Sequence, residues 1–418
     1  MDPGRKTIVV IGGGMSGMTT ALEAAEAGAS VHLVESGPSL GGRVAALARY
    51  FPKMCPPTCG IEINYRRIRR NPDVVVHTLT RVTQIEGRRG AFRVTLRTEP
   101  RRVNARCTAC GECVAVCPVE RPDAFNYGIA KTKAIYLPHA MAYPFSYVVD
   151  AATCKGAECS ECVRVCKYAA VDLGEQPVTR TVEAQAVVVA TGWSPYDASR
   201  LENLGFGRYP NVITNVMMER MLAEDGPTAG KPIRPSDGQT PKRIAYLQCA
   251  VSRDRNHLPY CSAVCCGASL KEAIIVREGL PDCEQAIFYI DRRVMGRNED
   301  VLARVEADPK TLLKRGKAVQ VTEDPASHTL KVLAEDTASG ARTEWEADLV
   351  VLATGMVPNT QGLPLPAGCT VDPNGFLVPD GETSGVVAAG CVVQPAAMTQ
   401  SMQEATGAAL KALIVANV

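Results

Sequence analysis

The chain has 418 residues, a formal net charge of +2 at pH 7 and 46% hydrophobic residues. This length can hold two or three units with cores of their own, and the balanced charge favours neither nucleic acid nor an acidic surface as a partner. Seventeen cysteines are the exceptional feature of the composition. They fall in tight groups in a chain without an export signal, so metal–sulfur ligation explains them better than disulfides.

The first recognisable unit is a strand–turn–helix–strand pattern near the start of the chain. A β-branched run from Ile8 to Ile11 predicts a strand, Met18 to Ala27 predicts an Ala-rich helix, and Ser30 to Val34 predicts a second strand. Glu35 follows that strand, where an acidic side chain accepts hydrogen bonds from a ribose diol. The pattern predicts a dinucleotide site.

Three glycines in the G-x-G-x-x-G arrangement occupy the turn, namely Gly12, Gly14 and Gly17. The first permits a tight turn, the second lets a pyrophosphate approach the backbone, and the third lets helix and strand pack closely. The helix start offers unpaired N–H groups and a positive dipole end to the phosphates.

Further motifs favour FAD over NAD. Leu40-Gly41-Gly42-Arg43 follows the first unit, and two later strands end in Ala-Thr-Gly, at residues 190–192 and 353–355. These segments resemble the two-dinucleotide-binding-domain flavoproteins of the thioredoxin reductase type. In that family they return the chain to the flavin domain and flank an inserted second domain.

The segment after these glycines is unusual for such flavoproteins. Prolines surround Cys55 and Cys59, so a stiff loop is expected that packs structurally or near the flavin; redox activity and metal ligation of this pair are the alternatives. The run Arg66–Arg70 is expected to be a solvated helix face, with partner docking as the alternative. Residues 74–98 predict a hairpin layer of the flavin domain.

A ferredoxin pattern then interrupts the flavin domain. The run Cys107-x2-Cys110-x2-Cys113-x3-Cys117-Pro118 is the bacterial ferredoxin run, and a second run follows with ligands at 154, 159, 162 and 166. In such pairs the fourth cysteine of each run ligates the other cluster. One [4Fe–4S] cluster is therefore assigned to Cys107, Cys110, Cys113 and Cys166, and the other to Cys117, Cys154, Cys159 and Cys162. The second run departs from the pattern in its longer first gap and in Lys167, which replaces the proline.

The second domain is predicted to open with the strand Arg243–Leu247, after a Pro/Gly-rich linker at residues 226–241. A G-x-G-x-x-[GA] loop should follow that strand in a pyridine-nucleotide flavoprotein, and it is absent, so direct oxidation of NAD(P)H there is not expected. Four clustered thiols stand in its place and predict a soft-metal site. They are Cys249, Cys261, Cys265 and Cys266.

The stretch QCAVSRDRNHLPYCSAVCC, residues 248–266, resembles the A subunits of heterodisulfide reductases and of the quinone-interacting membrane-bound oxidoreductase complex. The resemblance covers the whole chain and implies a third [4Fe–4S] cluster on these four cysteines, near the flavin. The chain is more compact than the methanogen-type subunits, which favours the quinone-interacting relative.

The closing segment, residues 385–410, corresponds to the last flavin-binding strand and helix of the thioredoxin-reductase-like family. Gly390-Cys391 replaces the usual Gly-Asp, and a helix from Met398 to Ala416 is predicted to point its dipole at the flavin. Gln394 and Gln400 are candidate flavin contacts, with a solvent-facing role as the alternative. The predicted FAD-binding residues are Gly12, Gly14, Met15, Ser16, Gly17, Glu35, Ser36, Gly42, Arg43, Ala190, Thr191, Gly192, Gly390, Cys391 and Gln400.

The predicted fold is an α/β flavoprotein of the thioredoxin reductase type with an inserted ferredoxin-like domain that carries two [4Fe–4S] clusters. The FAD-binding domain is assigned to 1–104, 173–204 and 348–418, the insertion to 105–172 and the second domain to 205–347. Cys283, Cys369 and Cys391 are expected to be small buried hydrophobes, and His257 to have a hydrogen-bonding or surface role.

These features predict an oxidoreductase subunit with one FAD and three [4Fe–4S] clusters. By resemblance, its complex links a membrane quinone pool, through a cytochrome-b-like subunit and a second flavin/iron–sulfur subunit, to adenylylsulfate reductase. The chain itself is expected to be cytoplasmic and membrane-associated only through partners. Two alternatives remain: a heterodisulfide-reductase-type subunit fed by a hydrogenase or formate dehydrogenase, and a stand-alone NAD(P)H-dependent flavoenzyme.

Overall fold

The computed structural model describes residues 5–294, 296–378 and 384–417. The chain forms two compact units. The first comprises residues 1–45, 58–193 and 358–418, and the second comprises residues 46–57 and 194–357. The chain therefore passes between the units four times, and residues 46–57 pack in the second unit although their neighbours in sequence belong to the first.

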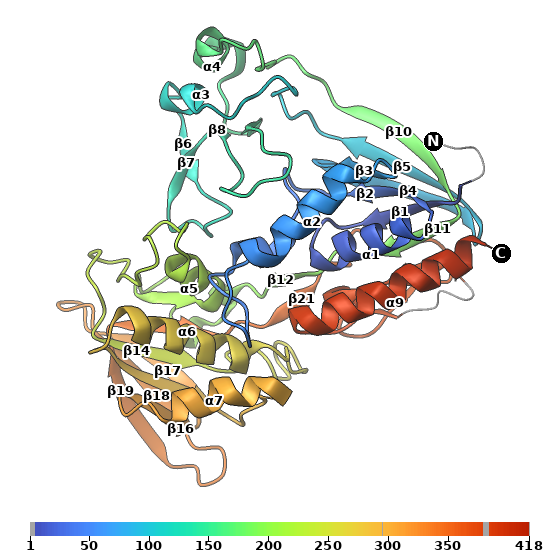
Figure 1. Ribbon diagram of the computed structural model, residues 1–418. Coiled ribbons are helices and arrows are strands. Elements are labelled where there is room, and N and C mark those ends of the chain that lie inside the picture. Colours follow the sequence, from blue (N-terminus) through green and yellow to red (C-terminus); the bar gives the residue numbers. More distant parts are fainter. Residues whose placement is uncertain (1–4, 295, 379–383, 418) are drawn as a thin grey trace. The chain divides into compact units, whose positions relative to one another are not determined.

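The first unit is built on a five-stranded parallel sheet (Figure 1). Ile8 and Val10 of the central strand face one core together with residues of the covering helices, whereas Val9 and Ile11 face a second core shared with an antiparallel sheet. A strand buried on both faces needs the continuous apolar run that the sequence has here. In sheet order the strands are β24 (Val386–Ala388), β11 (Ala186–Val189), β1 (Thr7–Ile11), β2 (Ser30–Val34) and β3 (Val74–His77).

Helices cover one face of this sheet and antiparallel strands cover the other. Helix α1 contacts both α2 and α9. The helices are α1 (Met15–Glu26), α2 (Thr58–Arg70) and α9 (Met398–Ala416), and the antiparallel strands are β4 (Thr80–Arg88), β5 (Ala91–Thr98) and β10 (Val178–Ala184). A two-stranded sheet pairs β22 (Thr370–Val371) with β23 (Leu377–Val378).

The inserted segment (residues 105–172) has little regular structure. It contains two short helices that contact each other, α3 (Glu112–Ala115) and α4 (Glu161–Val165). Two small antiparallel pairs complete it: β6 (Glu120–Pro122) with β7 (Lys131–Lys133), and β8 (Ile135–Tyr136) with β9 (Val148–Val149).

The second unit repeats the plan of the first with a parallel five-stranded sheet and an antiparallel three-stranded sheet. The parallel strands, in sheet order, are β13 (Val212–Thr214), β20 (Leu349–Leu352), β14 (Arg243–Leu247), β15 (Glu284–Tyr289) and β16 (Thr311–Arg315). The antiparallel strands are β17 (Lys317–Glu323), β18 (Leu330–Glu335) and β19 (Arg342–Ala347). The helices are α5 (Asn215–Leu222), α6 (Cys265–Gly279) and α7 (Glu299–Glu306), and β12 (Trp193–Pro195) and β21 (Met356–Pro358) lie where the chain enters and leaves the unit.

The elements confirm the predicted strands Ser30–Val34 and Arg243–Leu247 and the predicted helix Met398–Ala416. Three local predictions were wrong. Residues 74–77 form β3 of the parallel sheet, so the hairpin predicted for residues 74–98 consists of β4 and β5 only. The first helix begins at Met15, three residues before the predicted start, because the turn and the helix share the glycine motif. Cys59 lies on α2 and not in a loop, because the helix already begins after the prolines.

Candidate functional site

The glycine motif forms a turn that admits no side chain at two of its positions. Gly12 has a φ of +111°, and a Cβ atom there would lie 2.3 Å from the carbonyl oxygen of Ala190. A Cβ atom on Gly17 would lie 1.7 Å from the carbonyl oxygen of Gly12. These contacts bring β1, β11 and the first turn of α1 into close approach, as a dinucleotide fold requires.

The middle glycine leaves partly exposed backbone with open space beside it, where a pyrophosphate could lie. A Cβ atom on Gly14 would have only the Cα of Gly42 within 4 Å, at 3.8 Å. The two glycine turns face each other, since Gly41 donates its N–H to the carbonyl oxygen of Gly13 at 2.9 Å. Met15 begins α1 at this point, so free helix N–H groups adjoin the same surface. This cradle, which a larger residue would fill, fits a diphosphate.

Glu35 ties the end of β2 to the glycine turn. Its carboxylate accepts hydrogen bonds from the backbone N–H of Gly13 at 2.7 Å and of Gly37 at 2.6 Å, and from the Ser36 hydroxyl at 3.3 Å. Two carboxylate oxygens offer about four acceptor positions. A ribose hydroxyl could therefore still donate to Glu35, and the existing bonds would hold the side chain in place for it.

The Ala-Thr-Gly segment after β11 meets the returning chain at Asn359. Thr191 donates its hydroxyl to the carbonyl oxygen of Asn359 at 2.7 Å, and Asn359 donates its backbone N–H to Gly192 at 3.0 Å. Ala190 donates to the carbonyl oxygen of Ile11 at 2.7 Å and thus continues the pairing with β1. These three predicted contacts therefore lie at the same sheet edge as the glycine turn.

Residues of the closing segment reach the start of α1. A Cβ atom on Gly390 would lie 2.2 Å from the Ser16 hydroxyl, which donates to the carbonyl oxygen of Ser401 at 3.4 Å. Cys391 is buried and its thiol lies 3.4 Å from the carbonyl oxygen of Ala396. Cys391 thus packs as a small buried residue beside this junction. Gln394 and Gln400, in contrast, are exposed and both donate to Glu404.

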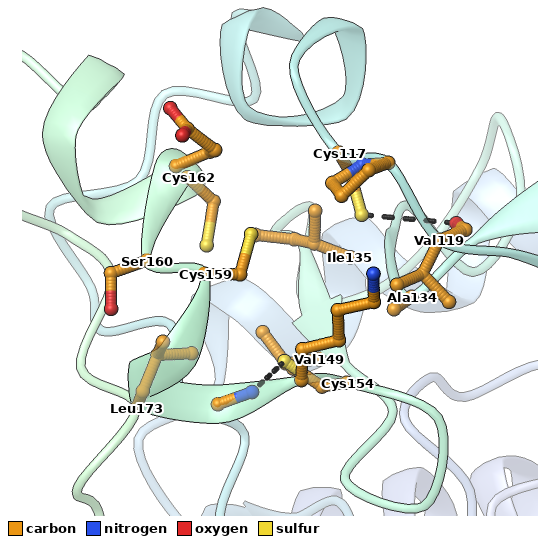
Figure 2. A pocket seen from close by; sticks show the side chains of 14 residues that line it. Cys117, Val119, Ala134, Ile135, Val149, Cys154, Cys159, Ser160, Cys162 and Leu173 are labelled. Carbon is orange, nitrogen blue, oxygen red and sulfur yellow. Dashed lines mark hydrogen bonds between the residues drawn. The ribbon is translucent and has the colours of Figure 1, made fainter.

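Four thiols from the two cysteine runs of the inserted segment line one cavity (Figure 2). Val119, Ala134, Ile135 and Val149 supply apolar walls. The thiols are those of Cys117, Cys154, Cys159 and Cys162, the set assigned to one cluster from the spacing. The cysteine that closes the first run therefore lies with three members of the second run.

The first three cysteines of the other assigned set also lie close together. Burial raises the pKa of the Cys113 thiol to about 12, and the neighbouring thiols of Cys107 and Cys110 contribute to the increase. Cys166 packs against the same small core of the inserted segment. A buried thiol such as Cys113 ionises readily only when a cation compensates its charge, which a metal–sulfur core provides.

The two cysteine runs have matching backbone geometry. Gly111 and Ser160 follow the second cysteine of each run, have φ values of +90° and +52°, and precede α3 and α4 respectively. In each run the backbone N–H two residues after the first cysteine donates to its sulfur at 3.4 Å, from Ala109 to Cys107 and from Gly156 to Cys154. N–H donors to sulfur are among the groups that set a cluster's potential.

In the second unit, four thiols surround the position that a nicotinamide-binding glycine loop would occupy. Cys249 follows β14, and Cys265 and Cys266 begin α6. Burial raises the pKa of Cys249 to about 11, with contributions from the thiols of Cys266 and Cys261. Burial also raises the pKa of Cys265, with contributions from all three other thiols. The mutual influence of their charges on these pKa values indicates that the four predicted cysteines lie near one another.

The loop that carries these thiols is held in an uncommon conformation. Cys249 and Ala263 have φ values of +52° and +60°, the left-handed region that non-glycine residues seldom adopt. The Ser252 and Ser262 hydroxyls lie 2.8 Å apart, and Ser262 accepts the backbone N–H of Met356 at 3.0 Å. Such a fixed loop lets adjacent cysteines at a helix start share a site with thiols upstream.

The donors in each of these groups are thiols alone. Among the described residues, no three or more His, Cys, Asp or Glu side chains lie close enough to hold one metal ion. The ligands of a zinc site lie about 2.3 Å from one atom, whereas a [4Fe–4S] cubane distributes its four thiolates over four irons. The all-thiol donor sets fit iron–sulfur clusters in kind; the ligand assignments themselves remain predictions.

The other candidate residues lie outside these groups. The His257 ring nitrogen Nδ1 lies 2.9 Å from the Tyr196 hydroxyl, which is a hydrogen-bonding role. Cys55 packs in the second unit, whereas exposed Cys59 lies on α2 of the first. Cys283 is buried, as expected for a structural cysteine.

The sequence did not identify residues of the inserted segment that contact the flavin-domain loop. The Tyr127 hydroxyl accepts a hydrogen bond from Arg43 at 2.7 Å, and His139 contacts Ser39 at 3.1 Å. The available signal was the aromatic content of the stretch between the cysteine runs, which is unusual in a chain with only 5% aromatic residues.

Solved structures of the same fold include the thioredoxin reductases of T. acidophilum and Lactococcus lactis. The T. acidophilum enzyme is 14% identical to the chain with a TM-score of 0.54, and the match covers 99% of the chain and 98% of that enzyme. The Lactococcus lactis enzyme is 13% identical with a TM-score of 0.55, and the match covers 99% of both chains. A model of NAD(P)-binding Rossmann-like domains matches residues 10–63. The chain has the fold of the thioredoxin reductases, with two α/β units, as predicted.

Curated relatives match the chain over nearly its whole length. The chain is 36% identical to the A subunit of the H2:CoB-CoM heterodisulfide,ferredoxin reductase of Methanothermobacter thermautotrophicus, over 97% of the chain and 63% of that protein. It is also 36% identical, with the same coverage, to the iron-sulfur A subunit of the CoB–CoM heterodisulfide reductase of Methanocaldococcus jannaschii. The A subunit of the H2/formate:CoB-CoM heterodisulfide,ferredoxin reductase of Methanococcus maripaludis is likewise 36% identical. The chain is a relative of the heterodisulfide reductase A subunits, and it spans about three fifths of their length.

Proposed function

We propose that the chain is the electron-transfer subunit of a multisubunit oxidoreductase of the heterodisulfide reductase type, with one FAD and three [4Fe–4S] clusters. The observation that carries the proposal is the group of four thiols in the second unit, Cys249, Cys261, Cys265 and Cys266, where a nicotinamide-dependent relative has a glycine loop. FAD exchanges two electrons and a [4Fe–4S] cluster exchanges one, so one chain that holds both connects two-electron with one-electron carriers.

The chain's own residues provide binding and orientation in this scheme. The turn at Gly12–Gly14 and the start of α1 receive the diphosphate, and Glu35 receives the ribose. The thiols of the inserted segment and of the second unit hold the clusters, and the N–H donors at Ala109, Gly156 and Ala263 point at their sulfurs. The apolar walls beside Cys117 keep water from that cavity.

The test is the cofactor content of the anaerobically purified chain. About twelve iron atoms and one FAD per chain are expected from three cubanes with four cysteine ligands each. Replacing Cys249 and Cys261 with serine should remove about four iron atoms and leave the FAD. Cys283→Ser is the matched control, because that buried cysteine of the same unit lies outside the thiol groups. Unchanged iron content in the double variant would contradict the assignment.

The electron donors and acceptors separate two forms of the proposal. The names of the relatives favour a complex in which hydrogen or formate supplies electrons and a partner chain reduces a thiol–disulfide substrate. The resemblance of residues 248–266 to the quinone-interacting complex supports the second form, in which a cytochrome-b-like subunit and adenylylsulfate reductase are the partners. Among the described residues, no helix has the length and apolar character to cross a bilayer. Membrane association through partners belongs to this second form.

Affinity purification from the native cell under anaerobic conditions distinguishes the two forms. Co-purification of a hydrogenase or formate dehydrogenase supports the first, and co-purification of a cytochrome-b-like subunit with adenylylsulfate reductase supports the second. Rapid bleaching of the flavin of the isolated chain by NADH or NADPH would contradict both and support a stand-alone flavoenzyme.

A further inference from the structure

The stretch between the two cysteine runs contains an aromatic loop (residues 125–147) that packs on the flavin-domain turn at residues 38–43. Both belong to the first unit. The turn follows Glu35 and contains Gly41 and Gly42, which face the glycine motif. Its geometry therefore affects the cradle proposed for the FAD diphosphate.

Hydrogen bonds hold the middle of this turn to the aromatic loop. The Ser39 hydroxyl accepts the backbone N–H of Tyr143 at 2.9 Å and lies 3.1 Å from Nε2 of His139. Leu40 donates its backbone N–H to the carbonyl oxygen of Tyr143 at 3.0 Å. Backbone and side chain of the turn are thus both bonded to residues that a flavoprotein without the insertion does not have.

Apolar contacts add to these bonds. Phe125, Met141 and Tyr143 pack against the core between the parallel sheet and its helices. The Tyr143 ring stacks on Tyr65 of α2 with 5.2 Å between centroids, and the Tyr65 hydroxyl donates to the carbonyl oxygen of Leu40 at 2.7 Å. The aromatic loop is therefore part of the core of the flavin-binding unit.

Arg43, the last residue of the turn, is oriented by two aromatic residues. Its NH1 group donates to the Tyr127 hydroxyl at 2.7 Å, and its Nε donates to the carbonyl oxygen of Trp193 at 2.8 Å. Its guanidinium carbon lies 5.9 Å and 5.1 Å from the two ring centroids. Trp193 directly follows the Ala-Thr-Gly segment of β11. The arginine thus connects the inserted segment with two parts of the predicted FAD site.

We propose that the aromatic loop is a structural part of the FAD site, in which Tyr127 and His139 are positioning residues that fix the turn at residues 38–43 and the side chain of Arg43. The inference rests on the proposed FAD site and assigns the inserted segment a second role beside cluster binding. The start of the stretch contributes Val119 to the cavity that contains Cys117 and Cys154, and its strands β8 and β9 supply Ile135 and Val149 to the wall. Filling that cavity with a cluster should therefore stabilise the loop that retains the flavin.

The test measures the rate of FAD release from the purified holoprotein, by the recovery of free-flavin fluorescence after dilution. Tyr127→Phe removes the hydroxyl that Arg43 bonds and keeps the ring, and about tenfold faster release is expected for one hydrogen bond to a charged group. Ser39→Ala removes the other side-chain bond and should act in the same direction. Tyr168→Phe is the matched control, because this tyrosine of the inserted segment is 48% exposed, and it should leave the rate unchanged.

A double-mutant cycle separates positioning from general destabilisation. If Tyr127 acts through Arg43, Tyr127→Phe should change the release rate less than twofold in an Arg43→Lys background. The same tenfold effect in both backgrounds would contradict this route. The iron content of each variant should match the wild type, because a general structural defect of the inserted segment would lower it.

Two failures are distinguishable. If the wild-type chain binds no FAD, the proposed function fails and this inference with it. If the wild type retains FAD and both Tyr127→Phe and Ser39→Ala release it at the wild-type rate, only the role of the aromatic loop is wrong. Faster release from Cys117→Ser, with the other clusters retained, is the result expected from the link to the cavity; release at the wild-type rate would contradict that link.

Discussion

Lys271 of α6 and Glu219 of α5 form a buried ion pair in the second unit. The ammonium and carboxylate lie 2.5 Å apart, and the two side chains are only 2% and 4% exposed. The pair also holds the segment at residues 46–57: Lys271 donates to the carbonyl oxygen of Arg49 at 2.6 Å, and Glu219 accepts the backbone N–H of Ala48 at 2.9 Å. Replacing Lys271 with methionine tests how far this pair stabilises the unit.

The expected loss is large because one charge would stay buried without a partner. Removing one member of a buried pair costs about 3–5 kcal/mol of unfolding free energy. Burial and the neighbouring Glu219 raise the pKa of Glu272, the next residue, well above the usual range. For a unit of this size each kcal/mol lowers the midpoint by about 2–4 °C, so a decrease of roughly 6–20 °C is expected.

The chain has two tryptophans, so a Trp193→Phe background leaves Trp345 of β19 as the fluorescent reporter of the second unit. Thermal unfolding of Lys271→Met in this background gives the midpoint. The matched control is Lys310→Met, which breaks the exposed pair with Asp282 and should cost less than about 1 kcal/mol. A Lys271→Met midpoint equal to that of the control would refute the reasoning. Adding Glu219→Gln should recover part of the loss, because no unpaired charge then remains.

Two further predictions concern the flavin-binding unit. Burial, followed by the contact with His32, lowers the pKa of His77 from 6.5 to about 4. Because the folded-state pKa is depressed, the contribution of neutral His77 to the free energy of unfolding is complete above pH 6.5 and is lost as the pH falls towards 4. After allowance for partial exposure, His77→Gln should remove about 1–2 kcal/mol of this pH dependence, measured by denaturant titrations at several pH values. An unchanged dependence of the unfolding free energy on pH in this variant would contradict the prediction. Gly17→Ala should abolish FAD binding and cost about 3 kcal/mol, because the added methyl would lie 1.7 Å from a backbone oxygen. Gly407→Ala is the control: a methyl group there meets open space on α9, so this substitution should stabilise the protein by about 0.5–1 kcal/mol. Equal effects of the two substitutions on thermal unfolding and flavin binding would show that the close approach at Gly17 is unimportant.

Much of the local structure follows from the sequence because it depends on short-range constraints. The β-branched run from Ile8 to Ile11 predicted the central strand, and the glycine at position 17 is needed where helix and strand approach each other. The ferredoxin pattern likewise predicted that Cys117 would lie with the second run, because the fourth cysteine of each run in such pairs ligates the other cluster, and Cys117 lines one cavity with Cys154, Cys159 and Cys162.

Contacts between distant segments were decided by tertiary structure. Nothing in the sequence indicates that residues 46–57 leave the first unit to pack on α6, because the bonds of Lys271 and Glu219 to that backbone depend on side chains more than 170 residues away. Nor does any motif pair Tyr127 with Arg43. Hydrogen-bond partners of this kind depend on where the folded core brings the chain, and no local pattern records that position. The sequence alone therefore determined the elements, the glycine turn and the cysteine groups, whereas the fold decided which loops support them.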